Sequence, residues 1–122
     1  MNVALWIMQG LLAVIFAASG VSKSTQSKKK LIAMGQTGVA PFPLPVVRFA
    51  AYCELLGVVG VIVPWLTGIA PILTPLAAAG FAVIMVAAIA SHAYLKEPLA
   101  VVYTSVILVM AVVVSAGRIG VL

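Results

Sequence analysis

The sequence predicts an all-α integral membrane protein, an antiparallel bundle of four transmembrane helices. Its 122 residues are 65% hydrophobic and only 7% charged, whereas a soluble domain carries about 25% charged residues. Four apolar runs each approach the ~20 residues that cross a hydrocarbon core of roughly 30 Å. Backbone groups in lipid must be paired within their own segment, so these runs are expected to be helical. The length suits one transmembrane domain covering residues 1–122.

The helices are expected at residues 3–21, 46–66, 70–94 and 99–117. The first run has no basic segment before it, unlike a secretory signal peptide, so we expect it to be retained. Short connections follow the second and third runs, and they make neighbouring helices antiparallel. The long connection, residues 22–45, contains three lysines and then an apolar stretch, which indicates a short helix on the membrane surface or a disordered loop.

The basic residues predict the orientation in the cell membrane. Six of the seven fall at one end of the bundle, namely Lys23, Lys28, Lys29, Lys30, Arg48 and Lys96. The positive-inside rule therefore places the loop 22–45 in the cytoplasm and both termini outside. Arg118, at the other end, is expected to be an interfacial anchor. Lysines and arginines beside apolar segments are topology signals, so we expect no nucleic-acid partner.

Glu54 is the most informative residue, because it lies about 12 Å inside the second helix at 1.5 Å per residue. A carboxylate at that depth costs on the order of 3 kcal/mol, so it needs a partner or a function. Ala50, Gly57 and Val61 share its helix face, which is small and suits the bundle interior. Glu54 is a candidate catalytic residue, with a structural hydrogen-bonding anchor as the alternative.

His92 is the only histidine, near the cytoplasmic end of the third helix. The antiparallel order places it in the same half of the membrane as Glu54. A Glu–His pair can relay protons, so we predict His92 as the second catalytic residue, with an interfacial histidine as the alternative. Two protein ligands are too few for a closed metal site, and none is predicted. Cys53, the single cysteine, is expected to be a small buried apolar residue.

Other polar side chains fall at a similar depth on the first, third and fourth helices. Ser19, Ser91, Tyr103 and Thr104 are predicted to line a polar-floored pocket that opens toward the cytoplasm. Each hydroxyl alone can instead bond its own helix backbone. The apolar walls are expected from Phe16, Phe81 and Met85.

Two basic residues border this predicted pocket and complete the candidate ligand-binding set. Lys23 and Arg48 either reach out to lipid phosphates or neutralise Glu54. Arg48 is six residues from Glu54 and about 120° away around the same helix, so Lys23 is the better partner.

Four short features stand together in order along the chain: residues 16–23, FAASGVSK; residues 54–57, ELLG; His92 at the end of the third helix; and Gly117-Arg118 closing the fourth. This combination is a resemblance to the DoxX-like membrane proteins. It implies a four-helix membrane fold with family-like polar positions at Lys23, Glu54 and His92. Relatives in this broad family are associated with membrane oxidoreductase complexes, including thiosulfate:quinone oxidoreductase, and distant animal relatives with receptor assembly.

Two functions remain open at this point. In one, the chain binds a lipophilic small molecule, with a quinone as the candidate cofactor, at Glu54 and His92 within a membrane oxidoreductase system. In the other it is a non-enzymatic accessory or chaperone subunit, whose lysine-rich loop docks partner membrane subunits or anionic lipid. The sequence leaves open whether the chain is an enzyme and whether it forms a homo-oligomer in the bilayer.

Overall fold

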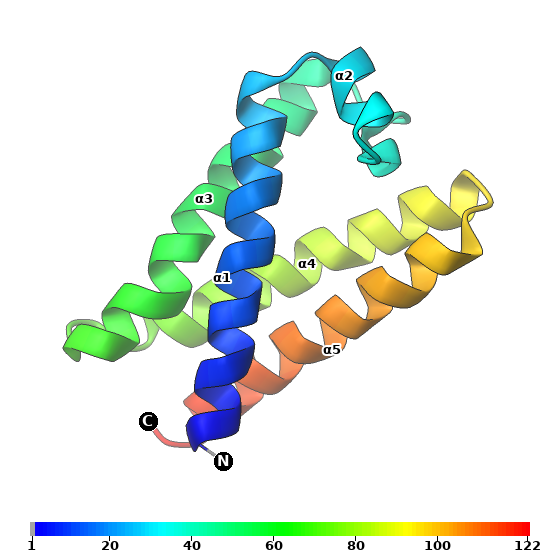
Figure 1. Cartoon of the computed structure of the whole chain (residues 1–122). Coiled ribbons are helices and arrows are strands. Elements are labelled where there is room, and N and C mark those ends of the chain that lie inside the picture. The colour runs from blue at the N-terminus through cyan, green and yellow to red at the C-terminus, as the bar shows by residue number, and fades with distance from the viewer. Residues whose placement is uncertain (1) are drawn as a thin grey trace.

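The computed structural model describes residues 2–122, and the regular elements in that range are all helices. They are α1 (Asn2–Thr25), α2 (Lys28–Ala33), the 3₁₀ helix η1 (Thr37–Val39), α3 (Leu44–Thr67), α4 (Leu73–Tyr94) and α5 (Pro98–Ile119) (Figure 1). The four long helices are each long and apolar enough to cross a membrane. The predicted all-α membrane bundle is confirmed.

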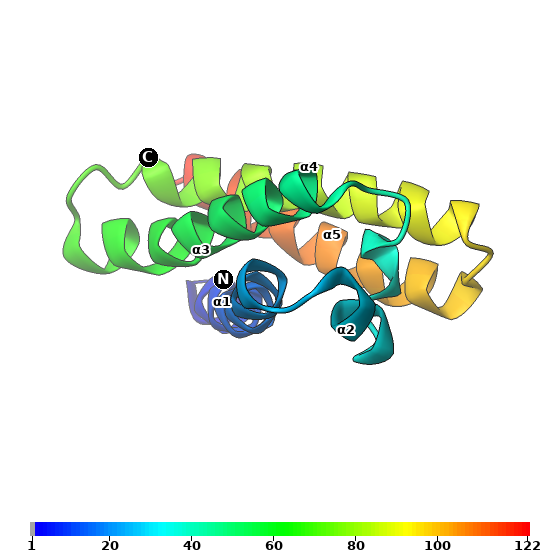
Figure 2. The ribbon, with the colours of Figure 1, turned by 90° about the horizontal axis from the view of Figure 1, so that it is seen from above.

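The bundle consists of two antiparallel pairs, α1 with α3 and α4 with α5. The pairs converge where both chain termini lie, which we call the terminal end, and diverge toward α2, which we call the loop end (Figure 1). The segment that contains α2 and η1 lies between the diverging pairs at the loop end (Figure 2). The two helix pairs therefore pack together at the terminal end, and the segment with α2 and η1 fills part of the space between them at the loop end.

Two helix boundaries differ from the sequence prediction for local reasons. α1 continues to Thr25 because the Arg48 guanidinium donates to the carbonyls of Lys23, at 2.7 Å, and of Gln26, at 2.8 Å. These bonds satisfy carbonyls that a helix end otherwise leaves unpaired. α4 begins at Leu73 and not near residue 70, because Ala70 takes a positive φ of 50° in the preceding turn.

The buried core runs between the four long helices. The Phe16 and Phe81 rings stack with their centroids 3.9 Å apart and nearly parallel. Gly57 makes this possible, because a Cβ there would lie 2.5 Å from a Phe81 ring carbon. The small-residue face predicted for the second helix is therefore a helix-packing surface.

A proline interrupts the backbone ladder of α3, and side chains from other helices compensate. Pro64 has no N–H, so it leaves the carbonyl of Gly60 without its usual helical donor. The Thr74 hydroxyl, on α4, donates to that carbonyl at 2.9 Å. Gln9, on α1, donates its amide to the neighbouring Val61 carbonyl at 2.7 Å. Three helices are thus joined at this depth by hydrogen bonds to backbone oxygen.

Arg118 closes the terminal end, and its expected role as an interfacial anchor is wrong. Its side chain is 2% exposed. Its Nε donates to the Gln9 side-chain oxygen at 2.6 Å, and Nη1 donates to Asn2 Oδ1 at 2.7 Å. The guanidinium also lies over the rings of Trp6 and Trp65, at 5.3 and 4.6 Å from their centroids. Neutral acceptors and two aromatic faces together replace water around the cation.

The long loop is folded, which favours the helical alternative predicted for it. Leu31, on α2, is fully buried and packs with Val39 and Val47. Lys28 donates to the Phe42 carbonyl at 2.7 Å, which fastens the exit of the loop. The expectation for Cys53 is wrong, because this residue is exposed on the outer surface of α3; α3 buries its other face against the bundle.

Candidate functional site

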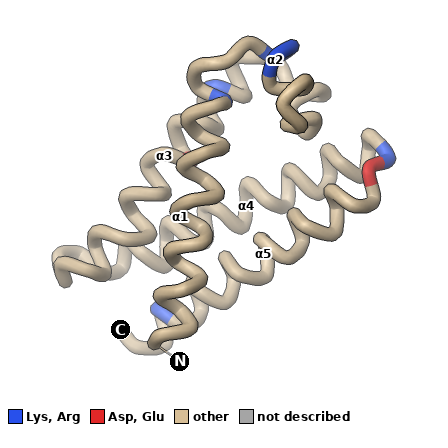
Figure 3. Tube along the Cα trace, in the orientation of Figure 1, with Lys and Arg blue, Asp and Glu red and all other residues tan. Residues whose placement is uncertain are grey.

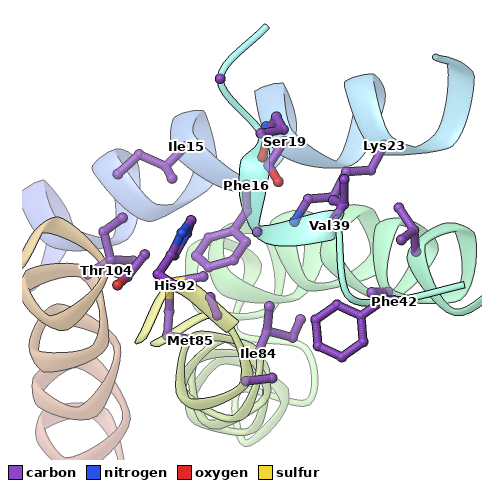
Figure 4. A pocket seen from close by; sticks show the side chains of 18 of the residues that line it. Ile15, Phe16, Ser19, Lys23, Val39, Phe42, Ile84, Met85, His92 and Thr104 are labelled. Carbon is purple, nitrogen blue, oxygen red and sulfur yellow. The ribbon is translucent and has the colours of Figure 1, made fainter. Parts of the chain in front are cut away.

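A pocket of about 420 Å³ opens between the two helix pairs at the loop end (Figure 4). α1 supplies one wall, α4 and α5 supply the opposite wall, and the loop and the start of α3 supply the rest. Most of the lining is apolar. The polar or charged side chains that line it are Ser19, Lys23, Gln36, His92, Tyr103 and Thr104.

Glu54 lies behind the wall that α1 contributes. Its side chain is fully buried, and Oε1 accepts from both the Lys23 ammonium and the Ser19 hydroxyl, each at 3.2 Å. Oε2 has no hydrogen-bond partner within residues 2–122. Of the two basic candidates, Lys23 therefore neutralises Glu54. This pairing is expected physically, because a lone carboxylate at this depth carries a large desolvation cost that an adjacent cation offsets.

The predicted Glu54–His92 pair is wrong as a direct contact. His92 Nδ1 instead lies 2.8 Å from Oε1 of Glu97, in the turn between α4 and α5. The turn folds Glu97 back over the last turn of α4, assisted by the positive φ of Lys96. Glu54 meanwhile is engaged by α1. The sequence placed both residues at the correct end of the bundle but paired His92 with the wrong carboxylate.

Glu97 is also held by the loop. The Thr37 hydroxyl, at the start of η1, donates to the same Oε1 atom at 2.9 Å. The hydrogen bond with His92, followed by that from Thr37, holds the pKa of the Glu97 carboxyl below its ordinary value of 4.5. Ser91 donates to the Gly38 carbonyl at 2.6 Å and fastens η1 to α4 a second time.

The remaining predicted ligand-binding residues divide into two groups. Tyr103 and Thr104 line the pocket: Tyr103 sets its ring edge-on to His92, with centroids 6.1 Å apart, and the Thr104 hydroxyl bonds the Ala100 carbonyl of its own helix at 2.6 Å. Arg48 and Ser91 are not among the lining residues. Both donate to backbone carbonyls, because each lies where a neighbouring segment ends with unpaired oxygens.

Comparison with known proteins identifies the family. The model of the DoxX-like family matches residues 7–114, which is most of the chain. The chain belongs to the DoxX-like family. The match covers all four transmembrane helices, so the family assignment and the fold support each other. Comparison with curated proteins and with solved structures gives no match.

In this DoxX-like chain, sequence reasoning missed the role of Glu97 and of the η1 segment. Glu97 is the only acidic residue besides Glu54, and its position five residues after His92 could have signalled the contact. Nothing in the sequence around Gly38 indicated that this glycine lies against His92. A Cβ at Gly38 would lie 3.1 Å from His92 Nε2, so this glycine lets the loop backbone pass over the imidazole.

Proposed function

We propose that this membrane protein binds a lipophilic molecule with a polar head, of the quinone class, in the pocket at the loop end. The observation that carries the proposal is the pocket itself, with apolar walls and with Lys23 and His92 on opposite sides. Figure 4 shows Ser19 and Lys23 on α1 facing His92 and Thr104 across it. Its volume lies in the range of about 300–1,000 Å³ that is common for small-molecule sites.

The chemistry of a quinone head matches the polar groups on the two walls. Its carbonyl oxygens accept hydrogen bonds, and Lys23 has three donors of which one is directed at Glu54. His92 offers a ring nitrogen from the other wall, which can accept from a hydroxyl of a reduced or hydroxylated quinone head. In this proposal Lys23 and His92 contact the head, whereas Glu54 positions Lys23 and the hydroxyl of Ser19.

The position of the pocket suits a ligand that arrives through the bilayer. α1 and α5 pack closely at the terminal end, where a Cβ at Gly117 would lie 2.8 Å from a Leu5 carbon. Toward the loop end the two helices diverge, and Tyr103, 48% exposed, borders the pocket on this side. Along α1 the lining runs from Ile15 to Lys23, about 12 Å at 1.5 Å per residue.

Membership of the DoxX-like family supports a role beside a membrane oxidoreductase system, since relatives in the broad family are associated with such complexes. In this role the bound quinone carries the redox chemistry, and a partner subunit exchanges electrons with it. The chain's own residues bind and orient the head.

Native mass spectrometry of the gently solubilised protein tests the proposal. We expect wild type to retain a lipophilic molecule of quinone mass, and Lys23→Gln and Glu54→Gln to lose it. Lys29→Gln is the matched control, because Lys29 is exposed on α2 and does not line the pocket. A wild-type protein that carries only bulk lipid, or variants that keep the ligand, would contradict the proposal.

An assembly role is the second candidate, and a specific surface favours it. An apolar groove between α3 and α4 is exposed on the bundle exterior, with Cys53, Gly57, Gly60 and Gly80 among its lining residues. Gly80 has no atom within 4 Å of the position for a Cβ, so another membrane helix can approach closely there. If this candidate is correct, a thiol-reactive photocross-linker attached to Cys53 should capture a second protein chain in membranes, and no cross-linked species should form if it is wrong.

We also propose that the loop end faces the cytoplasm. The basic residues gather at that end, and one lies at the terminal end (Figure 3), which is the asymmetry that the positive-inside rule uses. A C-terminal tag should then react with impermeant reagents in intact cells, and protection of the tag would reverse the assignment.

A further inference from the structure

We propose that Glu97 and His92 form a proton path between the aqueous surface at the loop end and the head of the ligand in the pocket. The inference rests on the proposed function and specifies it further: the ligand is one whose head exchanges a proton while bound. It uses the carboxylate that the structure places beside His92, not Glu54.

The outer end of the path is Glu97. Its side chain is 31% exposed, in the turn that joins two membrane-spanning helices. The bonds from His92 and Thr37 both reach Oε1. Oε2 has no hydrogen-bond partner within residues 2–122 and is available to water. A carboxylate with one oxygen held by the protein and the other at the surface can exchange protons with solvent and with the imidazole.

The inner end of the path is the second nitrogen of His92. The Nδ1–Glu97 contact of 2.8 Å assigns the Nδ1 proton to that bond, so Nε2 of the neutral ring is an acceptor. Nε2 has no hydrogen-bond partner among the described residues, and it is not one of the fully buried unpaired atoms. His92 lines the pocket, and in this proposal Nε2 is the ring atom that meets the ligand.

The transfer balances without any other reactant. A hydroxyl on the ligand head gives its proton to Nε2, the Nδ1 proton passes to Glu97 Oε1, and Glu97 releases a proton to water. The ligand is left as its anion, and the reverse sequence restores the starting tautomer of the imidazole. Lys23, which lies on the opposite wall and is the only Lys, Arg, Asp or Glu among the lining side chains, stabilises that anion.

The loop limits the access of water to the imidazole, so that protons do not bypass Glu97. The Gly38 backbone passes over the imidazole, and the Ser91 hydroxyl and Thr37 hydroxyl hold η1 in place. His92 retains 7% side-chain exposure under this cover. Tyr103, edge-on to His92, shields it from the α5 side. These contacts cover the imidazole on the loop and α5 sides, and Glu97, 31% exposed, lies between its Nδ1 and the aqueous surface.

The test follows the protonation of a bound probe. An alkyl 2-hydroxy-1,4-naphthoquinone changes colour when its hydroxyl ionises, and it is added to the full chain in lipid nanodiscs. After a rapid pH jump, the bound probe should re-equilibrate at least about tenfold more slowly in Glu97→Gln than in wild type, with unchanged probe affinity. Lys96→Gln is the matched control in the same turn and should behave as wild type. Added acetate should restore the rate in Glu97→Gln, which a merely structural role would not produce.

The outcomes separate the two proposals. Equal rates in wild type and Glu97→Gln, with the probe bound to both, would overturn the proton path and leave the binding function standing. Failure of the probe to bind wild type would overturn both. If Glu97→Gln does not fold, Glu97→Asp is measured, because it withdraws the carboxylate from His92 Nδ1 by one methylene. A slower rate that added acetate restores would support the path, and a wild-type rate would overturn it.

Discussion

At the scale of single residues, two buried charged side chains are stabilised in different ways. Glu54 is paired with a cation from another helix, 3.2 Å away. Arg118 has no acidic partner among residues 2–122 and is surrounded by side-chain amide oxygens and two indole rings. The Lys23–Glu54 pair leaves other donors of Lys23 directed at the pocket. The side chains around Arg118 instead fill the space next to its guanidinium. Only the first has the form of a binding site.

The Lys23–Glu54 pair should be strongly coupled. Replacing either residue alone leaves a buried charge or donor unsatisfied, and such a loss costs about 3–5 kcal/mol of unfolding free energy when the remaining partner stays charged. We expect Lys23→Met to be strongly destabilising and the double variant Lys23→Met/Glu54→Gln to recover much of the loss. Reversible unfolding in mixed micelles measures this. Additive losses would show that the two side chains do not stabilise each other.

At the scale of elements, the packing of α3 on α4 depends on the absence of a side chain at Gly57. A Cβ there would lie 2.5 and 2.8 Å from two ring carbons of Phe81. Phe81 in turn is stacked on Phe16 of α1. A single methyl group on α3 would therefore displace the contact that joins three helices.

Gly57→Ala should lower the unfolding free energy by about 1–3 kcal/mol, as overpacking does. Gly80→Ala is the matched control, because Gly80 lines the same exterior groove between α3 and α4 as Gly57. No atom lies within 4 Å of the position for a Cβ at Gly80. The control should be neutral, or slightly stabilising through its higher helix propensity. Both can be compared by unfolding in mixed micelles, and equal losses would contradict the packing described here.

The loop is the other element whose behaviour can be checked. Because the pKa of Glu97 is lower in the folded protein, the bonds from His92 and Thr37 contribute fully above its ordinary value of 4.5. The contribution is lost as the pH falls through the lowered pKa. Hydrogen exchange of η1, corrected for intrinsic rates, should show protection lost in acid for wild type. In Glu97→Gln, whose amide oxygen can still accept from His92 and Thr37, the protection should not depend on pH in this range, and a loss in acid equal to that of wild type would contradict this assignment.

The sequence predicted the elements better than the contacts between them. Apolar length locates four helices, because lipid leaves the backbone few alternatives. The depth of Glu54 likewise identified a residue in need of a partner. The choice of partner for His92 depended on how a three-residue turn folds and on the divergence of α3 from α4, and neither is encoded in spacing. The burial of Arg118 was not predicted for a similar reason, since its acceptor Gln9 is 109 positions away.

At the scale of the whole molecule, the two ends of the bundle differ in how their helices pack. The terminal end is closed by Arg118, Gln9 and the contact of Leu5 with Gly117. At the loop end the helix pairs diverge (Figures 1 and 2), and the pocket between them is lined on one side by η1 and the residues that precede it. A molecule packed tightly at one end, with a pocket and polar groups at the other, has the arrangement that the proposed ligand from the bilayer requires.

Photolabelling in membranes tests this central claim most directly. A benzoquinone with a photoreactive alkyl tail is incubated with the full chain, irradiated and mapped by peptide sequencing, with and without excess unlabelled quinone. The account predicts labels on the pocket-facing stretches of α1 and α4, near Phe16 and Met85, that the competitor abolishes. Labels spread over the lipid-facing surface and indifferent to the competitor would contradict it.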